Sequence, residues 1–291
     1  MATDRIDVAR LGFGTAPFGY GADGGPQDGA TDPEALLRAC LDAGIRYVDT
    51  SSTYGPAETL LGKARTLHGA GDLRVCVKIP RWAWPEGVTD ALRRLRLTGV
   101  DTVMFHSAVR DEMLDASMPA TMTRARLLAR ASRTGVSTYG ASDASLALAQ
   151  PWANSVQVEH SILNPSVVRE VAPLKRPGQE LIVRSVLCRG LLSTRRPAGA
   201  VPADAEGALV ALDRLAHRWG FDDLAALAIR FALDTPGVDV VLIGLASLDE
   251  LAVACGAAAH APLTRGQLDE LATFDRSTSD WTHPERWPVP A

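Results

Sequence analysis

Four polar residues lie at or just after the carboxyl ends of predicted strands, where they could carry out acid–base chemistry together. Asp49 and His106 end apolar, β-branched runs, Lys78 lies near the end of a third run, and Tyr54 follows in the loop after Asp49. In parallel α/β structure the carboxyl ends of neighbouring strands meet at one edge, and active sites form there. We therefore expect these four side chains to converge.

The chemistry that suits this set is reduction of a carbonyl group, since a carbon that receives hydride needs a proton delivered to its oxygen. Tyr54 can act as that general acid, because a free phenol has a pKa of about 10 and a nearby ammonium such as Lys78 favours its anionic form. Asp49 would pair with Lys78 and offset the cost of burying it. His106 would donate a hydrogen bond to the substrate oxygen and orient it.

Each of these residues also has an ordinary structural explanation. A strand-end aspartate often caps the next helix, a single histidine is often structural, and a loop tyrosine can simply pack. Lys78 is harder to explain in this way, because it lies in the apolar strand Val75–Ile79, where an unpaired lysine is costly. The joint occurrence of the four residues favours a functional site.

Short β-branched runs alternate with longer stretches of helical periodicity along the chain, which indicates parallel α/β structure. One such helix is Ala35–Ala43, which Asp32 and Pro33 precede and Gly44 ends. Gly135 is interpreted as the boundary before the fifth strand. The predicted strands are Leu11–Thr15, Arg46–Thr50, Arg74–Ile79, Thr102–His106, Val136–Gly140, Ser155–Val158, Leu181–Ser185 and Val238–Ile243. Periodicity alone leaves an open doubly wound sheet and a closed barrel both possible.

The composition is that of an ordinary globular domain. The 291 residues are 46% hydrophobic and 22% charged, and α/β barrels of this length form a single core. The formal net charge of −4, with dispersed arginines, argues against nucleic acid as a partner. No apolar run approaches the roughly 20 residues that span a bilayer, and the first residues do not resemble a signal peptide. We therefore expect a cytoplasmic protein with no membrane partner.

The cysteines give no sign of a metal site or a redox pair. Cys40, Cys76, Cys188 and Cys255 are widely separated and form neither a CxxC motif nor a cluster with histidine. Metal and disulfide motifs need closer spacing. We predict buried free thiols.

Two segments interrupt the regular alternation of strands and helices. Leu191–Ala205, which is rich in proline, alanine and glycine, is predicted to be a loop insertion before a helix near Ala208–His217. The tail 275–291 contains Trp281, Trp287 and several prolines, so it is predicted to be irregular and to pack over one end of a single domain spanning residues 1–291.

Over nearly its whole length the sequence resembles the aldo-keto reductase family. The matching positions are Leu11–Thr15, Asp42–Thr50, Tyr54, Gly55, Glu58, Leu61, Gly62, Val77, Lys78, Phe105 and His106. The resemblance implies a (β/α)8 TIM barrel of the α/β class with Asp49, Tyr54, Lys78 and His106 as its catalytic residues. It also implies that NADPH or NADH binds across the barrel mouth, where the tail would lie. A Rossmann fold is excluded, because Pro17 stands where its fingerprint needs glycine.

The resemblance also assigns segments to the cofactor. Residues 140–143 and Gln157 are similar to the family's carboxamide site, residues 184–192 to its pyrophosphate loop, and residues 243–247 to its adenosine site. The individual cofactor-binding residues implied are Gly14, Thr15, Ser142, Asp143, Gln157, Arg184, Ser185, Leu187, Arg189, Gly190, Gly244, Ala246, Ser247 and Glu250.

Several of these positions depart from the common family pattern. Asp143 replaces a frequent asparagine and cannot donate a hydrogen bond when ionised. Val186 replaces a common proline, and Ala254 stands where an asparagine often meets adenine. Leu245–Glu250 contains no lysine or arginine for the 2′-phosphate of NADPH and ends in two acidic residues. NADH and NADPH both remain open.

The function expected from the residues and the resemblance is an NAD(P)H-dependent oxidoreductase that reduces an aldehyde or ketone, or oxidises an alcohol. Two alternatives use the same fold: acid–base chemistry without redox on a specialised metabolite, and a non-enzymatic interaction module like the channel-associated members of the family. Substrate identity depends on loops at the barrel mouth. The candidate substrate-binding residues are Phe18, Tyr20, Trp82 and Trp84, and the family's default state is a monomer.

Overall fold

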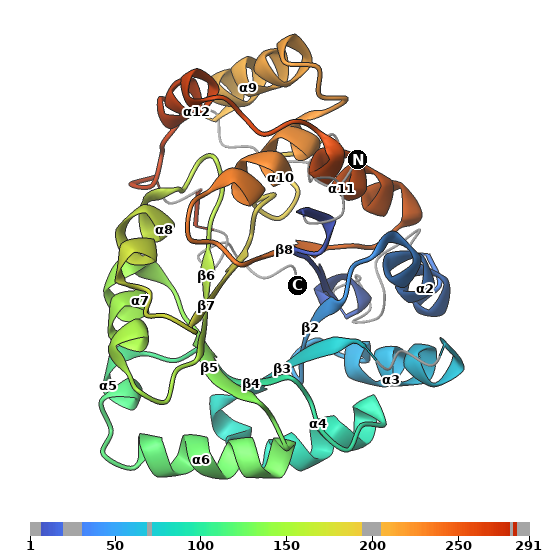
Figure 1. The fold of residues 1–291 in the computed structure, drawn as a ribbon, viewed down its shortest axis with the longest axis vertical. Coiled ribbons are helices and arrows are strands. Elements are labelled where there is room, and N and C mark those ends of the chain that lie inside the picture. The colour runs from blue at the N-terminus through green and yellow to red at the C-terminus, as the bar shows by residue number, and fades with distance from the viewer. Residues whose placement is uncertain (1–6, 20–30, 69–71, 194–204, 280–281, 284–291) are drawn as a thin grey trace.

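Eight parallel strands close into a barrel in which spatial order follows chain order (Figure 1). The computed structural model describes residues 7–19, 31–68, 72–193, 205–279 and 282–283. Its strands are β1 (Leu11–Gly14), β2 (Tyr47–Ser51), β3 (Arg74–Pro80), β4 (Thr102–His106), β5 (Arg133–Ser137), β6 (Ser155–Glu159), β7 (Glu180–Arg184) and β8 (Val240–Gly244). Because β8 pairs with β1, the fold is the closed barrel rather than the open sheet.

Helices surround the ring of strands and cover its outer face (Figure 1). They are α2 (Pro33–Ala43), α3 (Ala57–His68), α4 (Gly87–Leu95), α5 (Arg110–Met113), α6 (Met118–Ala129), α7 (Gly140–Ala149), α8 (Ser166–Val171), α9 (Glu206–Arg218), α10 (Leu224–Asp234), α11 (Leu248–Ala259) and α12 (Arg265–Ala272), with short 3-10 turns η1 (Ala16–Phe18), η2 (Arg81–Ala83) and η3 (Ala172–Leu174). The start of α2 follows the sequence signals: the Asp32 carboxylate accepts the N–H groups of Glu34 and Ala35. Gly44 ends this helix with a φ of 97°.

The fifth strand is the one whose predicted bounds differ most from the structure. The sequence predicts Val136–Gly140 with Gly135 as the boundary before it, whereas β5 runs from Arg133 to Ser137. This interpretation of Gly135 was wrong, because the glycine lies inside the strand. Here β5 and β6 approach so closely that a Cβ would be 2.0 Å from the Ser155 carbonyl oxygen. The other predicted strands differ from the observed ones by at most two residues at either end.

The inside of the barrel holds its own apolar cluster, separate from the core between strands and helices. This inner cluster consists of Tyr47, Cys76, Met104, Ile182, Val240 and Leu242. Side chains alternate between the two faces of a strand, so residues two positions later face the interior as well, one layer closer to the carboxyl ends. On β2, β3, β4 and β7 those residues are Asp49, Lys78, His106 and Arg184. The pleat therefore gathers polar groups in one layer at the barrel mouth.

The described part of the tail packs beside the segment that follows β6. The Arg276 N–H donates to the Leu163 carbonyl at 2.8 Å, and Asp275 pairs with Arg169 of α8 at 3.2 Å. After Ser193 the chain is described again from residue 205, just before α9, which agrees with the predicted helix near Ala208–His217. None of the helices in the described ranges is long and apolar enough to cross a membrane.

The cysteines are free thiols, as predicted. Cys40, Cys76 and Cys188 are buried, and Cys255 is half-buried. Burial raises the pKa of Cys40 to about 12, so this thiol is protonated at neutral pH. Within residues 7–283, leaving aside the undescribed gaps, histidine, cysteine and carboxylate side chains form no group of three or more that could hold a metal ion.

Candidate active site

A buried ion pair lies at the centre of the polar layer. The Lys78 ammonium, 1% exposed, donates to Oδ2 of Asp49, which is 3% exposed. Burial disfavours the ammonium, but the Asp49 carboxylate together with neighbouring groups has the opposite and larger effect, so the pKa of Lys78 is raised and the side chain stays charged. The ion pair is the arrangement that the sequence predicted for an otherwise costly buried lysine.

Gln157 joins this pair and completes a closed set of hydrogen bonds. Its Nε2 donates to Oδ1 of Asp49 at 2.8 Å, and its Oε1 accepts from Lys78 Nζ at 3.3 Å. Oε1 also accepts from the Ser137 hydroxyl at 3.3 Å. Both side chains are fully buried. In this structure the glutamine therefore orients the ion pair, and Ser137 is a member of the layer that the sequence reasoning missed.

Tyr54 lies on the loop after β2, with its ring against the ion pair. The Lys78 Nζ is 5.0 Å from the centre of the phenol ring. Burial raises the pKa of Tyr54, while the Lys78 ammonium partly opposes that rise through its charge and a hydrogen bond. The phenol is therefore protonated at neutral pH and next to a group that stabilises its anion, which suits a general acid.

A second buried carboxylate holds the loop that carries Tyr54. Glu58 of α3 is 1% exposed and accepts from Nε of Arg94 on α4 at 2.6 Å. Its other oxygen accepts from the Ser52 hydroxyl at 3.1 Å, and Arg94 also donates to that hydroxyl at 3.1 Å. Since Ser52 is in the same loop as Tyr54, this network fixes the loop against two outer helices.

His106 faces the phenol from the end of β4. Its ring centre is 6.2 Å from that of Tyr54, and the two rings meet edge to face. Burial, with added repulsion from Lys78 and Arg184, lowers the pKa of His106 to about 3. The imidazole is therefore neutral at physiological pH, with one nitrogen that donates and one that accepts.

The Ser51 hydroxyl contacts Nδ1 of the His106 imidazole. Ser51 Oγ lies 3.0 Å from Nδ1 of His106 and 3.1 Å from the Lys78 carbonyl oxygen, which already accepts the Ser52 N–H. The sequence reasoning overlooked Ser51, although its place two residues after Asp49 on β2 was the available signal. With Asp49, Tyr54, Lys78 and His106, which we call the tetrad, it forms one contiguous polar site.

The turn after β7, matched to the pyrophosphate loop, has an unusual backbone. Ser185, Cys188, Arg189 and Gly190 have φ values of 61°, 46°, 51° and 88°. Across the described ranges, the N–H groups of Leu187 and Arg189 meet no protein acceptor. The Arg189 side chain is exposed. Adjacent free N–H groups beside a cation can bind phosphate oxygens.

The residues matched to the adenosine site surround the start of α11. Ser247 caps this helix by accepting the Glu250 N–H at 3.3 Å, and the Glu250 carboxylate accepts the Ala246 N–H at 2.7 Å. Gly244 ends β8 beside Gly14 of β1. The first turn of α11 is acidic, so this region offers negative rather than positive charge.

The remaining cofactor candidates lie around the mouth. Ser142 and Asp143 are in the first turn of α7, where Ser142 is exposed. The Thr15 hydroxyl donates to the Asp49 carbonyl oxygen at 3.1 Å, which ties the β1 loop to β2. Two of the positions that depart from the family pattern, Val186 and Ala254, are each 1% exposed.

The aromatic residues proposed as a substrate pocket lie in different environments. Phe18 is fully buried and packs edge to face against Phe13 with ring centres 5.6 Å apart, which favours a packing role. Trp84 is half-buried against Phe105. Trp82, on the η2 turn after β3, is 80% exposed. Tyr20 lies outside the described residues, as do Trp281 and Trp287.

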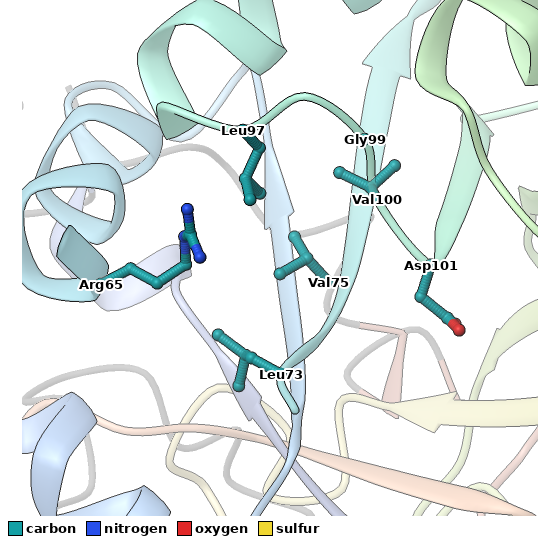
Figure 2. A pocket seen from close by; sticks show the side chains of 7 residues that line it. All are labelled: Arg65, Leu73, Val75, Leu97, Gly99, Val100 and Asp101. Carbon is teal, nitrogen blue, oxygen red and sulfur yellow. The ribbon is translucent and has the colours of Figure 1, made fainter. Parts of the chain in front are cut away.

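A cavity of about 240 Å³ lies at the opposite end of the barrel, near the amino ends of β3 and β4. Figure 2 shows Arg65 beside mainly aliphatic side chains, with the Asp101 carboxylate turned away from them. That carboxylate pairs with Arg74 at 3.1 Å. The cavity contains none of the tetrad, so it is separate from the candidate active site.

Comparison with known proteins relates the whole barrel to one family. The profile of the Aldo/keto reductase family matches residues 10–276. "Aldo-keto reductase YhdN" of Bacillus subtilis (strain 168) is 24% identical, covering 98% of this chain and 96% of the relative. A "Probable voltage-gated potassium channel subunit beta" of Oryza sativa subsp. japonica is 28% identical, covering 82% of this chain and 86% of the relative. The holo form of aldo-keto reductase AKR11C1 from Bacillus halodurans superimposes with a TM-score of 0.76 at 22% identity, covering 92% of each chain.

Proposed function

The chain belongs to the aldo/keto reductase family, and on that premise we propose that it is a nicotinamide-dependent oxidoreductase that interconverts a carbonyl compound and an alcohol. The observation that carries the proposal is the protonated Tyr54 phenol beside the buried Lys78–Asp49 ion pair. Such a phenol is poised to exchange a proton with a substrate oxygen. The neutral His106 imidazole supplies a second hydrogen bond.

In the proposed reduction, a nicotinamide held at the barrel mouth would supply the hydride that the carbonyl carbon accepts. Tyr54 gives its proton to the carbonyl oxygen, and Lys78 stabilises the phenolate that forms. The Lys78 ammonium donates to Asp49 and to Gln157, and these two contacts hold it in place. In the reverse direction Tyr54 must first lose its proton and then accept one from the alcohol.

The direct test is titration of the protein with NADH and NADPH, followed by turnover on a panel of aldehydes, ketones and alcohols. Quenching of tryptophan fluorescence measures binding, and absorbance of the reduced nicotinamide measures turnover. Binding of at least one nicotinamide with turnover is expected. Failure to bind either nicotinamide would overturn the proposal. It would favour a role in protein interaction, such as the name of the channel subunit from Oryza sativa suggests for that relative.

The described residues fit a dinucleotide cofactor at two places. The free N–H groups of Leu187 and Arg189 suit phosphate oxygens. The α11 start would receive the adenosine end, and its acidic first turn opposes the extra phosphate of NADPH. These features support our proposal that the pyrophosphate binds at the turn after β7 and that NADH is the preferred nicotinamide.

We accordingly expect NADH to bind at least about tenfold more tightly than NADPH. Leu248→Arg should reduce the ratio of the NADPH Kd to the NADH Kd about tenfold. Residue 248 is 47% exposed in the first turn of α11, so the new guanidinium can pair with the extra phosphate of NADPH. Fluorescence titrations of both proteins with both nicotinamides measure the effect. Tighter binding of NADPH by the unaltered protein would refute the preference.

Ser51→Ala should lower kcat with little effect on nicotinamide binding. The Ser51 hydroxyl lies 3.0 Å from Nδ1 of His106, so it helps to hold the imidazole in one orientation and one tautomer. Loss of the hydroxyl removes this contact, and we expect kcat to fall about tenfold. Ser51→Thr, which keeps the hydroxyl, should recover part of the rate. Equal rates for the alanine variant and the unaltered enzyme would show that Ser51 does not position His106.

A further inference from the structure

Arg184 is the last residue of β7, and its side chain belongs to the polar layer inside the mouth. It follows Ile182 of the inner cluster by two residues, so both side chains face the interior. From there it reaches past β6 to the loop after β5. Its Nη2 donates to the Thr138 carbonyl at 3.0 Å, and Cζ lies 4.0 Å from the centre of the Tyr139 ring.

Among the described residues, the half-buried guanidinium of Arg184 contacts neutral groups. Besides the Thr138 carbonyl it contacts the Ser185 hydroxyl at 3.3 Å. In the part of the chain that the structure describes, no carboxylate forms an ion pair with it. Its register neighbour on β6, Glu159, accepts the Gly140 N–H at 2.9 Å. Removing a cation from water without an anionic partner is costly, and several N–H groups of Arg184 remain available to an anion.

The charge of Arg184 acts on the reacting groups. After burial and Lys78, it contributes to the lowered pKa of His106, and it partly opposes the rise in the pKa of Tyr54 that burial causes. The Thr138 carbonyl that accepts from the guanidinium comes directly after Ser137, the register neighbour of His106, so the Arg184 side chain reaches the strand beside His106.

We propose that Arg184 binds a carboxylate carried by the substrate, so that this site acts on aldehydes or ketones that bear an acidic group. The inference rests on the oxidoreductase function proposed above and narrows its substrate class. A guanidinium can pair with both carboxylate oxygens at once, which fixes the orientation of the carbonyl group as well as adding affinity. The exposed faces of Trp82 and Tyr139 offer apolar surface to the rest of the substrate.

The test compares formylbenzoate with formylbenzamide, each as its ortho, meta and para isomers, because the amide has nearly the same shape without the charge. Arg184→Gln removes the positive charge, and Arg184→Lys retains it. Arg126→Gln is the control, since it removes an exposed arginine from the outer helix α6. We would measure kcat/KM for each substrate, the Kd of the nicotinamide by fluorescence, and the Kd of each formylbenzoate by calorimetry.

We expect the unaltered enzyme to prefer at least one formylbenzoate to its amide. Arg184→Gln should reduce that preference, measured as the ratio of kcat/KM for the formylbenzoate to kcat/KM for its amide, about tenfold to a hundredfold, whatever its effect on turnover of the amide itself. Arg184→Lys should keep part of the preference, and Arg126→Gln all of it. A variant that still turns over the amide is folded, so loss of preference cannot be attributed to unfolding.

Two results would overturn the inference. One is an unchanged preference in Arg184→Gln. The other is equal weakening of both substrates together with the nicotinamide, which would assign the guanidinium to a cofactor phosphate. If none of these proteins turns over an aldehyde, the oxidoreductase proposal fails, but calorimetry still tests the anion site. Loss of formylbenzoate binding in Arg184→Gln alone would support the site. Formylbenzoate binding that Arg184→Gln retains, or no binding by the unaltered protein, would refute it.

Discussion

Tyr54→Phe should reduce turnover by about a hundredfold to ten-thousandfold while the Kd of the nicotinamide changes by less than about twofold. The variant keeps the ring that packs beside Lys78 but removes the phenol hydroxyl next to the ion pair, and general acid catalysis contributes about this much to a rate. Steady-state kinetics of carbonyl reduction, with fluorescence titration of the nicotinamide, measure the two effects separately. Retention of more than about a tenth of the rate would show that another group delivers the proton.

The pH dependence of the unaltered enzyme follows from the same groups. Because burial raises the pKa of Tyr54, the phenol remains protonated through neutral pH, and reduction should be nearly flat there. Oxidation of the alcohol needs the phenolate, so its rate should rise as the pH increases. His106, with a pKa of about 3, should add no step near pH 6.5. A step near pH 6.5 that disappears in His106→Gln would contradict the neutral imidazole.

Much of the fold could be predicted from the sequence, because the deciding signals were local. The β-branched runs gave eight strands, and the Asp32 cap with Gly44 gave the bounds of α2. Closure into a barrel was not local information, since it depends on pairing between β1 and β8, at opposite ends of the chain. The resemblance to a family supplied that step.

The candidate site was predictable where a polar residue interrupts an apolar strand. Lys78 and its partner Asp49 were found in this way, and the structure brings them together. Ser51 and Ser137 were missed because small hydroxyl residues are common in strands, and only the pleat and the register show that they face the interior. The position of Gly135 inside β5 likewise depends on a neighbour that is distant in the sequence.

The direction of a long side chain was the least predictable feature of the site. The family resemblance places Arg184 in the pyrophosphate loop, but it gives no direction for the side chain. In the structure the guanidinium leans toward the β5 side, where it contacts the Thr138 carbonyl and the Tyr139 ring. Sequence gives the strand and the face of such a residue, but the contacts of a flexible side chain depend on the tertiary structure around it.

Lys78→Met should both unfold the protein more easily and remove activity, and the two losses can be separated. Without the ammonium, the Asp49 carboxylate is left buried with Gln157 as its remaining side-chain donor. Breaking one side of a buried ion pair costs about 3–5 kcal/mol, so the free energy of unfolding should fall by about that amount. Turnover should fall at least about a hundredfold, since the group that contributes most to stabilising the Tyr54 phenolate is then missing.

The double variant Asp49→Asn with Lys78→Met distinguishes stability from chemistry. It removes both charges but keeps an amide that can bond to Gln157, so most of the lost stability should return while turnover stays low. Urea unfolding followed by circular dichroism measures stability, and single-turnover reduction measures the chemical step. If the double variant is no more stable than Lys78→Met, the buried carboxylate is not the source of the loss. If it regains turnover, the ammonium has no part in tuning Tyr54, and the ion pair is only a structural element of the barrel.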